Sequence, residues 1–534
     1  MSEKLFFENL NIISEKFPSF YFFIDKNYKK NNYEFPSIQI ENLNLENIDI
    51  LYLYKITNQI PKKIIEWLSK DKNKKLIIIE DDVDKLHFFL YKKLAKSFLN
   101  NDQISIHYLF NENSLNEIIY KNPSNLIDVI TLDKKSEKFE DLKDEIIKKN
   151  ISSFYQMHNS IYSYKHFKNF FKNIDLLKDS FLANDLKDSF DKFSAIIVGA
   201  GPSLKYSIEK LKTLKNKALI IACGSAITLL SKNNITPHLA ILIDPNFDEF
   251  LRVKEAFPVN VPVIYSTRVN NGIFSSLNGP IGYLKAAING FFEAYLEKKI
   301  NITQEYVGLE LDEKALSVTS IAIEYAIYLG CKNIILDGVD LAYSENKEYL
   351  SNLIKDKKVS SDPFEKKVLD ISKNNERIYT NYKWQIEKEC FSNIAKNHKD
   401  INFLNATKDG LKIDDFLDIS YDNLEEKYLN ASLDVSSYVH LLIENSKLEI
   451  SNDQIEDIKK EIKDSFEKTI SFLKTLINSK KEYEKILALS DLEEEIAYNY
   501  FLIEPFYTFS KLDEENKYIK LYELALNFSK ILND

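Results

Sequence analysis

The most constraining feature of this chain is the stretch 194–245, in which apolar runs alternate with segments of helical spacing. The runs at 195–198, 218–222 and 239–243 have the length of buried strands, and this order predicts a parallel sheet with crossover helices. Ligands of such sheets bind beyond the carboxyl ends of the strands, and all three runs end in small or acidic residues. A nucleotide-type site at that edge is therefore the first hypothesis.

The turn after the first strand, GAGPSL at 199–204, suits an anionic ligand. Gly199 and Gly201 allow a tight turn and a close approach of the backbone to a ligand. Pro202 fits a first helical position, and Ser203 adds a hydroxyl beside the helix N-terminus. The dinucleotide fingerprint is incomplete, because Leu204 replaces its third glycine, and no Walker lysine is present. The alternative is that the glycines only make a close strand-to-helix turn.

Other small or hydroxyl-bearing residues follow predicted strands or begin a predicted helix, where free N–H groups and hydroxyls suit a phosphate or ribose. A helix predicted at 317–328 precedes a strand at 333–337, and a loop follows that strand. Ser317 is equally compatible with a plain helix cap. The candidate ligand contacts of this group are Gly224, Ser225, Ser317, Thr319, Ser320, Gly338 and Tyr343.

Four segments together resemble a known family: GAGPSL, the IDP at 243–245, the long run SVTSIAIEYAIYLGCKNIILDGVDLAYSENKEY at 317–349, and NFLNATKDGLKI at 402–413. They look like the motility-associated factor (Maf) flagellin glycosyltransferases, whose central domain is similar to that of bacterial sialyltransferases. The resemblance covers about 193–415, and its motifs occur in the family's order.

The resemblance implies a glycosyltransferase that moves a nonulosonic acid, of the pseudaminic or legionaminic type, from a CMP-sugar to Ser or Thr of flagellin. Such a reaction would serve flagellum assembly and motility, and the ligand contacts named above would then bind the donor. The same domain occurs in archaeal pterin pyrophosphokinases, so a nucleotide-dependent pyrophosphokinase is an alternative. A non-catalytic flagellin-binding module or chaperone is another.

Transfer to a hydroxyl needs a base, and it passes through an oxocarbenium-like sugar. Asp340 and Asp244 stand at strand ends as candidate bases, and His398 precedes the last predicted strand. Each has a structural alternative, since Asp-Pro commonly begins a turn and His398 lies in a polar stretch. The donor's phosphodiester leaves as CMP without strictly requiring a metal, so we expect no metal site and no cofactor.

The length of 534 residues predicts more than one domain. We expect an N-terminal α/β domain at 1–150, a central glycosyltransferase domain with a leading helical segment at 151–415, and a helical bundle at 416–534. Strands are predicted at 20–24, 48–56, 75–79, 104–110 and 128–132. The acids 80–82 are interpreted as a solvated strand end, with ribose binding as the alternative. In the bundle, capping boxes are predicted at Ser451 with Gln454 and at Ser490 with Glu493.

Charge and cysteine content limit the partners. The net charge is −10, which argues against a general binder of nucleic acid or anionic membranes. Three cysteines without close pairing favour a reducing cytoplasm. The first residues carry acids and no apolar h-region, and no apolar run is long enough to span a bilayer, so we expect neither secretion nor membrane insertion.

Overall fold

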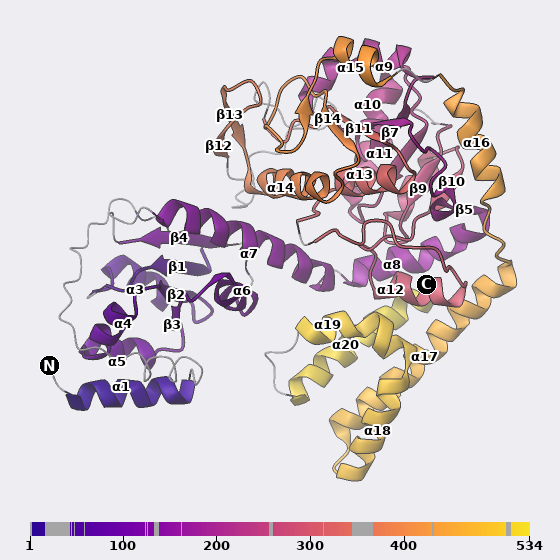
Figure 1. Ribbon diagram of the computed structural model, residues 1–534. Coiled ribbons are helices and arrows are strands. Elements are labelled where there is room, and N and C mark those ends of the chain that lie inside the picture. The colour runs from indigo at the N-terminus through magenta and orange to yellow at the C-terminus, as the bar shows by residue number, and fades with distance from the viewer. Residues whose placement is uncertain are drawn as a thin grey trace. The chain divides into compact units, whose positions relative to one another are not determined.

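The predicted apolar runs form the centre of a nine-stranded parallel sheet in the computed structural model (Figure 1). The strand order is β15-β14-β11-β6-β7-β8-β9-β10-β5, and every neighbouring pair is parallel. From β6 the chain proceeds outward through β7, β8, β9 and β10, and then returns to place β11 on the other side of β6. The strands are β5 (Ser180–Leu182), β6 (Ser194–Val198), β7 (Leu219–Cys223), β8 (Leu239–Leu242), β9 (Val263–Tyr265), β10 (Ile281–Tyr283), β11 (Asn333–Asp337), β14 (Asn402–Asn405) and β15 (Leu417–Asp418).

The structure describes residues 3–16, 43–132, 138–343, 367–508 and 514–533, apart from 44, 47, 58, 123, 125, 162, 256–259, 313 and 430–431. The described residues form two compact units, one ending at Gln156 and one beginning at Met157. The strand predicted at 20–24 lies outside the described residues. The predicted domain boundaries at 150 and 415 stay predictions.

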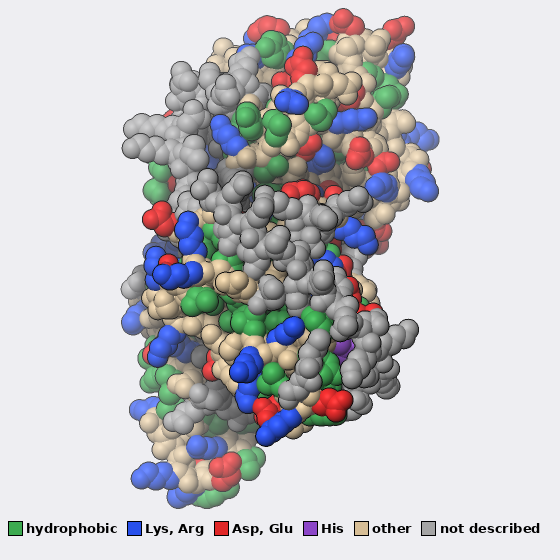
Figure 2. All heavy atoms as spheres, turned by 90° about the vertical axis from the view of Figure 1, so that its left-hand side faces the viewer, with side chains coloured by type: hydrophobic (Ala, Val, Ile, Leu, Met, Phe, Trp, Pro, Cys, Tyr) green, Lys and Arg blue, Asp and Glu red, His purple; other side chains and the backbone are tan. Residues whose placement is uncertain are grey.

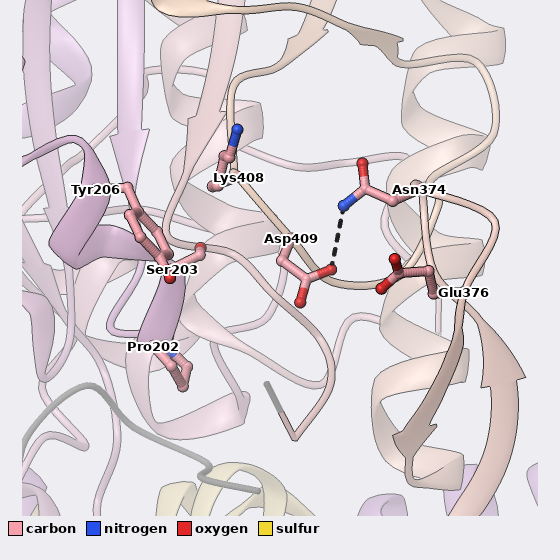
Figure 3. Close-up of a pocket in the computed structure, with 7 residues that line it drawn as sticks. All are labelled: Pro202, Ser203, Tyr206, Asn374, Glu376, Lys408 and Asp409. Atoms are coloured by element: carbon pink, nitrogen blue, oxygen red, sulfur yellow. Dashed lines mark hydrogen bonds between the residues drawn. The ribbon is translucent and has the colours of Figure 1, made fainter. Parts of the chain in front are cut away.

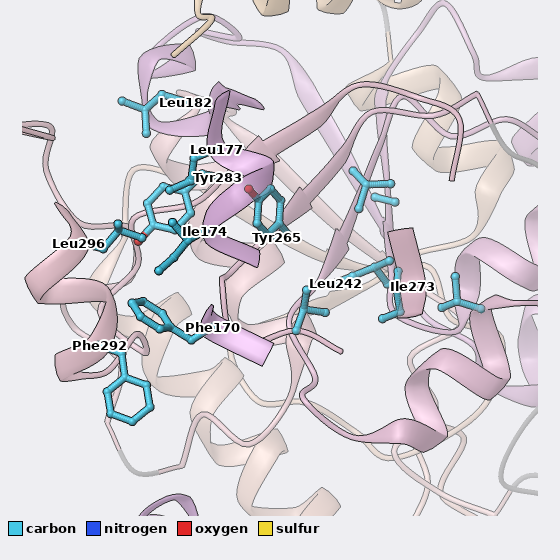
Figure 4. Close-up of a cluster of buried hydrophobic side chains, with 14 of the residues drawn as sticks. Phe170, Ile174, Leu177, Leu182, Leu242, Tyr265, Ile273, Tyr283, Phe292 and Leu296 are labelled. Atoms are coloured by element: carbon cyan, nitrogen blue, oxygen red, sulfur yellow. The ribbon is translucent and has the colours of Figure 1, made fainter. Parts of the chain in front are cut away.

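Both faces of the central sheet are covered, as a parallel sheet requires. Alternate side chains of β6 enter different cores: Ile196 and Val198 face one, and Ala195 and Ile197 face the other. The first core, part of which Figure 4 shows, continues into the C-terminal helices. The second is covered by α13, α14 and α16. The elements between the strands are η1 (Ile174–Asp179), η2 (Ala183–Leu186), η3 (Pro202–Tyr206), α9 (Ile208–Thr213), α10 (Ala226–Lys232), α11 (Phe247–Val253), η4 (Asn271–Ser276), α12 (Phe291–Lys299), α13 (Val318–Tyr328), α14 (Tyr382–Asn397) and α15 (Tyr421–Tyr428), and the hairpin β12 (Val368–Ile371) with β13 (Arg377–Thr380).

The N-terminal unit is a smaller α/β unit, with four parallel strands in the order β3-β2-β1-β4. Apolar runs again make the strands, and β1 is buried along its whole length. Its elements are α1 (Glu3–Lys16), β1 (Ile50–Tyr54), α3 (Lys62–Ser69), β2 (Lys75–Glu80), α4 (Val83–Leu90), α5 (Lys93–Leu99), β3 (Ile104–Tyr108), α6 (Glu112–Tyr120) and β4 (Ile127–Thr131), and the unit ends within α7 (Phe139–Ile161). This confirms a second α/β region.

The C-terminal region is helical, as predicted. The capping box at Ser451 and Gln454 is confirmed and begins α17. The second predicted box is wrong, because Ser490 lies inside α18 rather than before a helix. The helix α8 (Ser163–Asn173), which precedes the central sheet in the chain, packs against α20. The C-terminal helices are α16 (Val435–Asn445), α17 (Asn452–Asn478), α18 (Glu482–Glu494), the π-helix η7 (Ala497–Leu502), α19 (Ile503–Thr508) and α20 (Glu514–Asn533).

Acidic and basic side chains are interspersed on the described part of the face in Figure 2. Among the described residues, no helix combines the length and apolar character needed to cross a bilayer.

Candidate functional site

The crossover from β6 to β11 creates a switch point, where the loops after these two neighbouring strands meet at the carboxyl edge of the sheet. The loops are packed directly on each other. The Gly201 N–H donates to the Gly338 carbonyl oxygen at 2.8 Å, and the Gly199 N–H donates to the Asp337 carbonyl oxygen at 2.8 Å. A Cβ on Gly199 would lie 2.9 Å from the Val339 side chain, and Gly338 itself has a φ of +66°. These glycines are therefore needed for the close approach of two loops.

Asp340 anchors the start of η3. Its carboxylate is 2% exposed and accepts hydrogen bonds from the Ser203 N–H at 3.0 Å and the Ser203 hydroxyl at 2.5 Å. A Cβ on Gly201 would overlap this carboxylate. The carboxylate of Asp340 thus takes the position at the start of η3 that an anionic ligand was expected to occupy.

Asp337, which the sequence reading did not select, lies just behind Asp340. It accepts hydrogen bonds from the Ser207 hydroxyl at 2.9 Å and the Tyr421 hydroxyl at 2.6 Å. Burial raises the pKa of Asp337 to about 6, and the charge of Asp340 adds to that rise. An acid at the end of the apolar strand NIILD was the available signal. Together the two aspartates hold both ends of η3.

A pocket of about 250 Å³ opens beside η3 (Figure 3). Pro202, Ser203 and Tyr206 line one side, and Asn374 and Glu376, from the turn between β12 and β13, line the other. Lys408 and Asp409, from the loop after β14, complete the lining. The pocket therefore lies by the carboxyl ends of β6 and β14. Of the predicted ligand contacts, Pro202 and Ser203 line it.

Tyr343 is held in the protein by both its backbone and its side chain. Its N–H donates to the Tyr379 carbonyl oxygen at 2.8 Å, and its hydroxyl accepts a hydrogen bond from Asn381 Nδ2 at 3.3 Å. Its ring lies 4.8 Å from that of Trp384, centroid to centroid.

A second group of predicted contacts gathers beyond β7. Gly224 has a φ of +50°, and a Cβ there would lie 3.5 Å from Val318, the first residue of α13. Ser225 precedes α10. Ser317 is the N-cap of α13, yet its side chain makes no capping bond. Its hydroxyl bonds the buried Glu387 instead and opposes the rise that burial causes in the pKa of that carboxyl. The α13 N-terminus therefore lies beside the β7 turn.

The hydroxyls inside α13 face thiols. Thr319 bonds the Cys223 thiol, whose pKa burial raises to about 12. The Cys390 thiol lies 3.7 Å from the Ser320 hydroxyl. One turn further, burial raises the pKa of Glu324 to about 7, helped by the charge of Glu310. Thr319 and Ser320 are buried and support the helix start from behind.

Asp244 is the most accessible predicted acid, with a side chain 36% exposed. Its Oδ1 accepts hydrogen bonds from the Asn246 N–H and Nδ2, at 2.8 and 2.7 Å. Arg252 lies 3.6 Å from its Oδ2 and bonds Glu249 at 2.8 Å. Burial raises the pKa of Glu249, and Arg252 opposes this rise.

His398 lies away from this group. It caps the C-terminus of α14 and precedes β14, so it stands at the amino edge of the sheet. The Ile401 N–H donates to its carbonyl oxygen at 3.1 Å, and the neighbouring Asp400 pairs with Lys332, which precedes β11. The structure therefore does not bring His398 together with the switch-point loops.

Glu80, the last residue of β2 in the N-terminal unit, is buried, which corrects the interpretation of a solvated strand end for this residue, whereas the Asp81 side chain is 28% exposed. Glu80 is fully buried and accepts hydrogen bonds from three backbone N–H groups, those of Ile56, Asp81 and Asp82. Its carboxylate also lies 3.3 Å from Lys55 Nζ and 3.5 Å from Lys85 Nζ. The buried Lys85 and the partly exposed Lys55 pair with this carboxylate, and the pattern of acids did not reveal either lysine.

Among the described residues, no group of three or more His, Cys, Asp and Glu side chains is arranged to hold a metal ion.

Comparison with known proteins gives three findings. Residues 168–346 match the family model of 6-hydroxymethylpterin diphosphokinase MptE-like proteins. An uncharacterized protein of Treponema pallidum (strain Nichols) is 40% identical over 53 residues, which are 10% of this chain and 25% of the Treponema protein, so the match spans a quarter of that relative's length. A solved MAf glycosyltransferase from Magnetospirillum magneticum AMB-1 aligns with 100% of this chain and 95% of its own, at a TM-score of 0.47 and 14% identity.

Proposed function

We propose that this protein is a glycosyltransferase that moves a nonulosonic acid from a CMP-activated donor to a Ser or Thr hydroxyl of flagellin. The observation that carries the proposal is the pocket beside η3, at the switch point of a parallel sheet, where open α/β folds bind their ligands. The identities of the donor and the acceptor are inferred from the resemblance of the sequence motifs to those of the Maf family. The CMP-sugar is a substrate, so the proposal includes no cofactor.

Two sets of residues serve the donor in this proposal. Pro202 and Ser203 line the pocket, and the packing of Gly199 and Gly201 against the Gly338 loop positions them. Gly224, Ser225 and the start of α13 lie at the same edge of the sheet and form the second set.

Asp244 is the better placed base. Its side chain is 36% exposed although Asn246 and Arg252 contact its oxygens, whereas Asp340 is buried and bonded to Ser203. A base must reach the hydroxyl whose proton it removes. In this proposal Asp244 takes the proton and Asp340 orients the η3 turn. The three free, buried cysteines agree with a reducing compartment, and we place the reaction in the cytoplasm.

A second candidate is a pterin diphosphokinase, which the match of residues 168–346 favours. That match covers about a third of the chain, and the flanking α/β and helical regions have no evident use in a small-molecule kinase. A flagellin-binding module without catalysis is a weaker candidate, because it would not need a polar pocket at the carboxyl edge.

Binding and transfer assays separate these functions. We expect CMP to raise the melting temperature, CMP-nonulosonates to raise it further and NAD to leave it unchanged, since a ligand at about a hundred times its Kd adds roughly 2.7 kcal/mol. Incubation with donor and flagellin should add one sugar mass per modified residue by mass spectrometry. A shift with ATP and a hydroxymethylpterin, but not with CMP, would support the diphosphokinase instead.

A further inference from the structure

The pocket beside η3 offers hydrogen-bond acceptors more than donors. Glu376 and Asp409 contribute carboxylates, and Asn374 donates to Asp409 at 3.5 Å. The Ser203 hydroxyl donates its proton to Asp340 and is therefore not a donor to a ligand in the pocket. The Ser203 N–H donates to the same carboxylate and is therefore not available to a ligand. Such a lining suits a ligand that brings many hydroxyl donors, and it disfavours a phosphate, which has none to give.

Two further side chains narrow the ligand class. Tyr206 is 59% exposed, and its ring lines the pocket, where it can cover the apolar face of a sugar ring (Figure 3). The Lys205 ammonium also lies over this ring, 4.7 Å from its centroid. Lys408 is the single cation among the described lining residues, and an ammonium group pairs with a carboxylate. Hydroxyls, an apolar ring face and one carboxylate are the features of an acidic sugar.

The size of the pocket fits a part of the donor rather than the whole. Its volume is about 250 Å³, below the range of roughly 300–1,000 Å³ that holds complete drug-sized ligands. A single sugar moiety fits this space, and a complete CMP-sugar requires further surface.

We propose that this pocket is the sugar subsite: it binds the nonulosonate of the donor, with the carboxylate at Lys408, the hydroxyls at Asp409, Glu376 and Asn374, and the ring on Tyr206. The assignment rests on the proposed function. It places the nucleotide outside this pocket, so the sugar and CMP are recognised by different side chains.

The test measures the Kd of CMP and of CMP-activated pseudaminic and legionaminic acid by calorimetry, for the full-length protein and matched variants. Tyr206→Ala and Lys408→Ala remove the ring and the cation. Tyr379→Ala removes a ring that is 49% exposed and outside the pocket lining. Lys399→Ala removes an exposed cation at the amino edge of the sheet. Retained circular dichroism and melting temperature show that each variant is folded.

We expect the wild type to prefer the CMP-sugar over CMP, and each pocket variant to lose about tenfold of that preference, the scale of one charge-assisted contact. CMP affinity should stay unchanged, and the two control variants should match the wild type. If the wild type shows the preference and both pocket variants keep it, the sugar binds elsewhere and this assignment is wrong while the function stands. If the pocket variants weaken CMP itself, the pocket holds the nucleoside, which also overturns it. A wild type without any preference for the CMP-sugar would overturn the proposed function together with this subsite.

Discussion

The two parallel sheets of this protein present acids at their carboxyl edges and use them differently. In the N-terminal unit, Glu80 is enclosed by Lys55, Lys85 and backbone N–H groups. In the central unit, Asp337 and Asp340 accept hydrogen bonds from the hydroxyls of Ser207, Tyr421 and Ser203 and from the Ser203 N–H. One edge is closed by charge pairing, and the other is held by hydroxyls beside a pocket.

The difference shows that an acid at the end of a strand does not by itself predict whether the residue stabilises the fold or contributes to a ligand site. Buried charges are tolerated where they are paired, as the Glu80 carboxylate is with Lys55 and Lys85. The central aspartates instead fix the shape of η3, and between their anchoring points Lys205 and Tyr206 remain exposed while Leu204 is buried. We therefore assign a structural role to the N-terminal edge and ligand binding to the central edge.

The largest effect is expected from removing Glu80, which pairs with Lys55 and Lys85 in the N-terminal unit. Glu80→Ala leaves the buried Lys85 without its carboxylate, and loss of one partner of a buried ion pair costs about 3–5 kcal/mol. The chain has two tryptophans, Trp67 and Trp384, one in each unit. Urea unfolding followed by Trp67 fluorescence in a Trp384→Phe background should show the loss, while CMP affinity stays constant. Glu66→Ala, which removes an exposed ion pair, is the control and should cost less than about 0.5 kcal/mol. Equal, small effects of both substitutions would contradict a buried, paired Glu80.

The central edge should fail by a steric route. Gly201→Val places side-chain atoms on the Asp340 carboxylate and the Gly338 carbonyl oxygen. The two loops must then separate, which costs up to about 3 kcal/mol of folding free energy and removes donor binding. Gly290→Ala is the control, because its added Cβ meets the flexible Arg268 guanidinium at 3.2 Å. If folded Gly201→Val binds CMP as the wild type does, the glycine turn is a packing element without a part in the donor site.

The pH dependence of stability should show whether Asp337, which accepts hydrogen bonds from two hydroxyl groups, titrates with a raised pKa. The pKa of Asp337 is raised to about 6 from an ordinary value of 3.8, so the unfolded chain releases this proton at lower pH than the folded protein does. The contribution of Asp337 to stability is therefore present below pH 4 and is lost as the pH rises through 6. Asp337→Asn removes this loss, and both hydroxyl partners can reorient toward an amide.

As the pH rises from 4.5 to 7.5, we expect the free energy of unfolding of Asp337→Asn to increase relative to that of the wild type by about 1–2 kcal/mol. Trp384 fluorescence in a Trp67→Phe background reports the central unit. A constant offset between variant and wild type at all pH values would mean that Asp337 does not titrate in this range.

The smallest effect is expected at Tyr343. Tyr343→Phe removes a hydroxyl that accepts one hydrogen bond of 3.3 Å from Asn381. If the hydroxyl also meets the donor's phosphate, CMP binding weakens by about 1 kcal/mol, with a smaller effect on turnover. Calorimetry on the variant decides this. An unchanged Kd for CMP would leave Tyr343 as a support for the β13 strand and remove it from the donor contacts.

The central strands were predictable because their apolar runs are long and bounded by glycine or acid, as at residues 195–198 and 218–222. β5 and β10 have three residues each and were missed, whereas the equally short β9 was predicted because it lies in the longer run VPVIYS at 261–266. The hairpin of β12 and β13 was missed as well. Its pairing depends on contacts across a turn rather than on an apolar run.

The candidate site was predictable in part. Pro202 and Ser203 were predicted because they belong to a local motif, the glycine-rich turn after a strand. Asn374 and Glu376 line the pocket from a turn more than 150 residues later, and no local sequence pattern identifies them. Lys408 and Asp409 lie within the motif NFLNATKDGLKI, yet nothing in that motif shows which of its residues face a ligand. The engagement of Asp340 by Ser203 depends on two loops meeting in space.

Hydrogen–deuterium exchange of the full-length protein, with and without CMP-nonulosonate, tests the central contrast most directly. The account predicts protection of peptides that cover Gly199–Ser207, Gly224–Ser225, the start of α13 and Asn374–Glu376. Peptides that contain Lys55 and Glu80–Asp82 should exchange at the same rate in both states. Protection at the N-terminal edge, with none at the central edge, would contradict the assignment of the donor site.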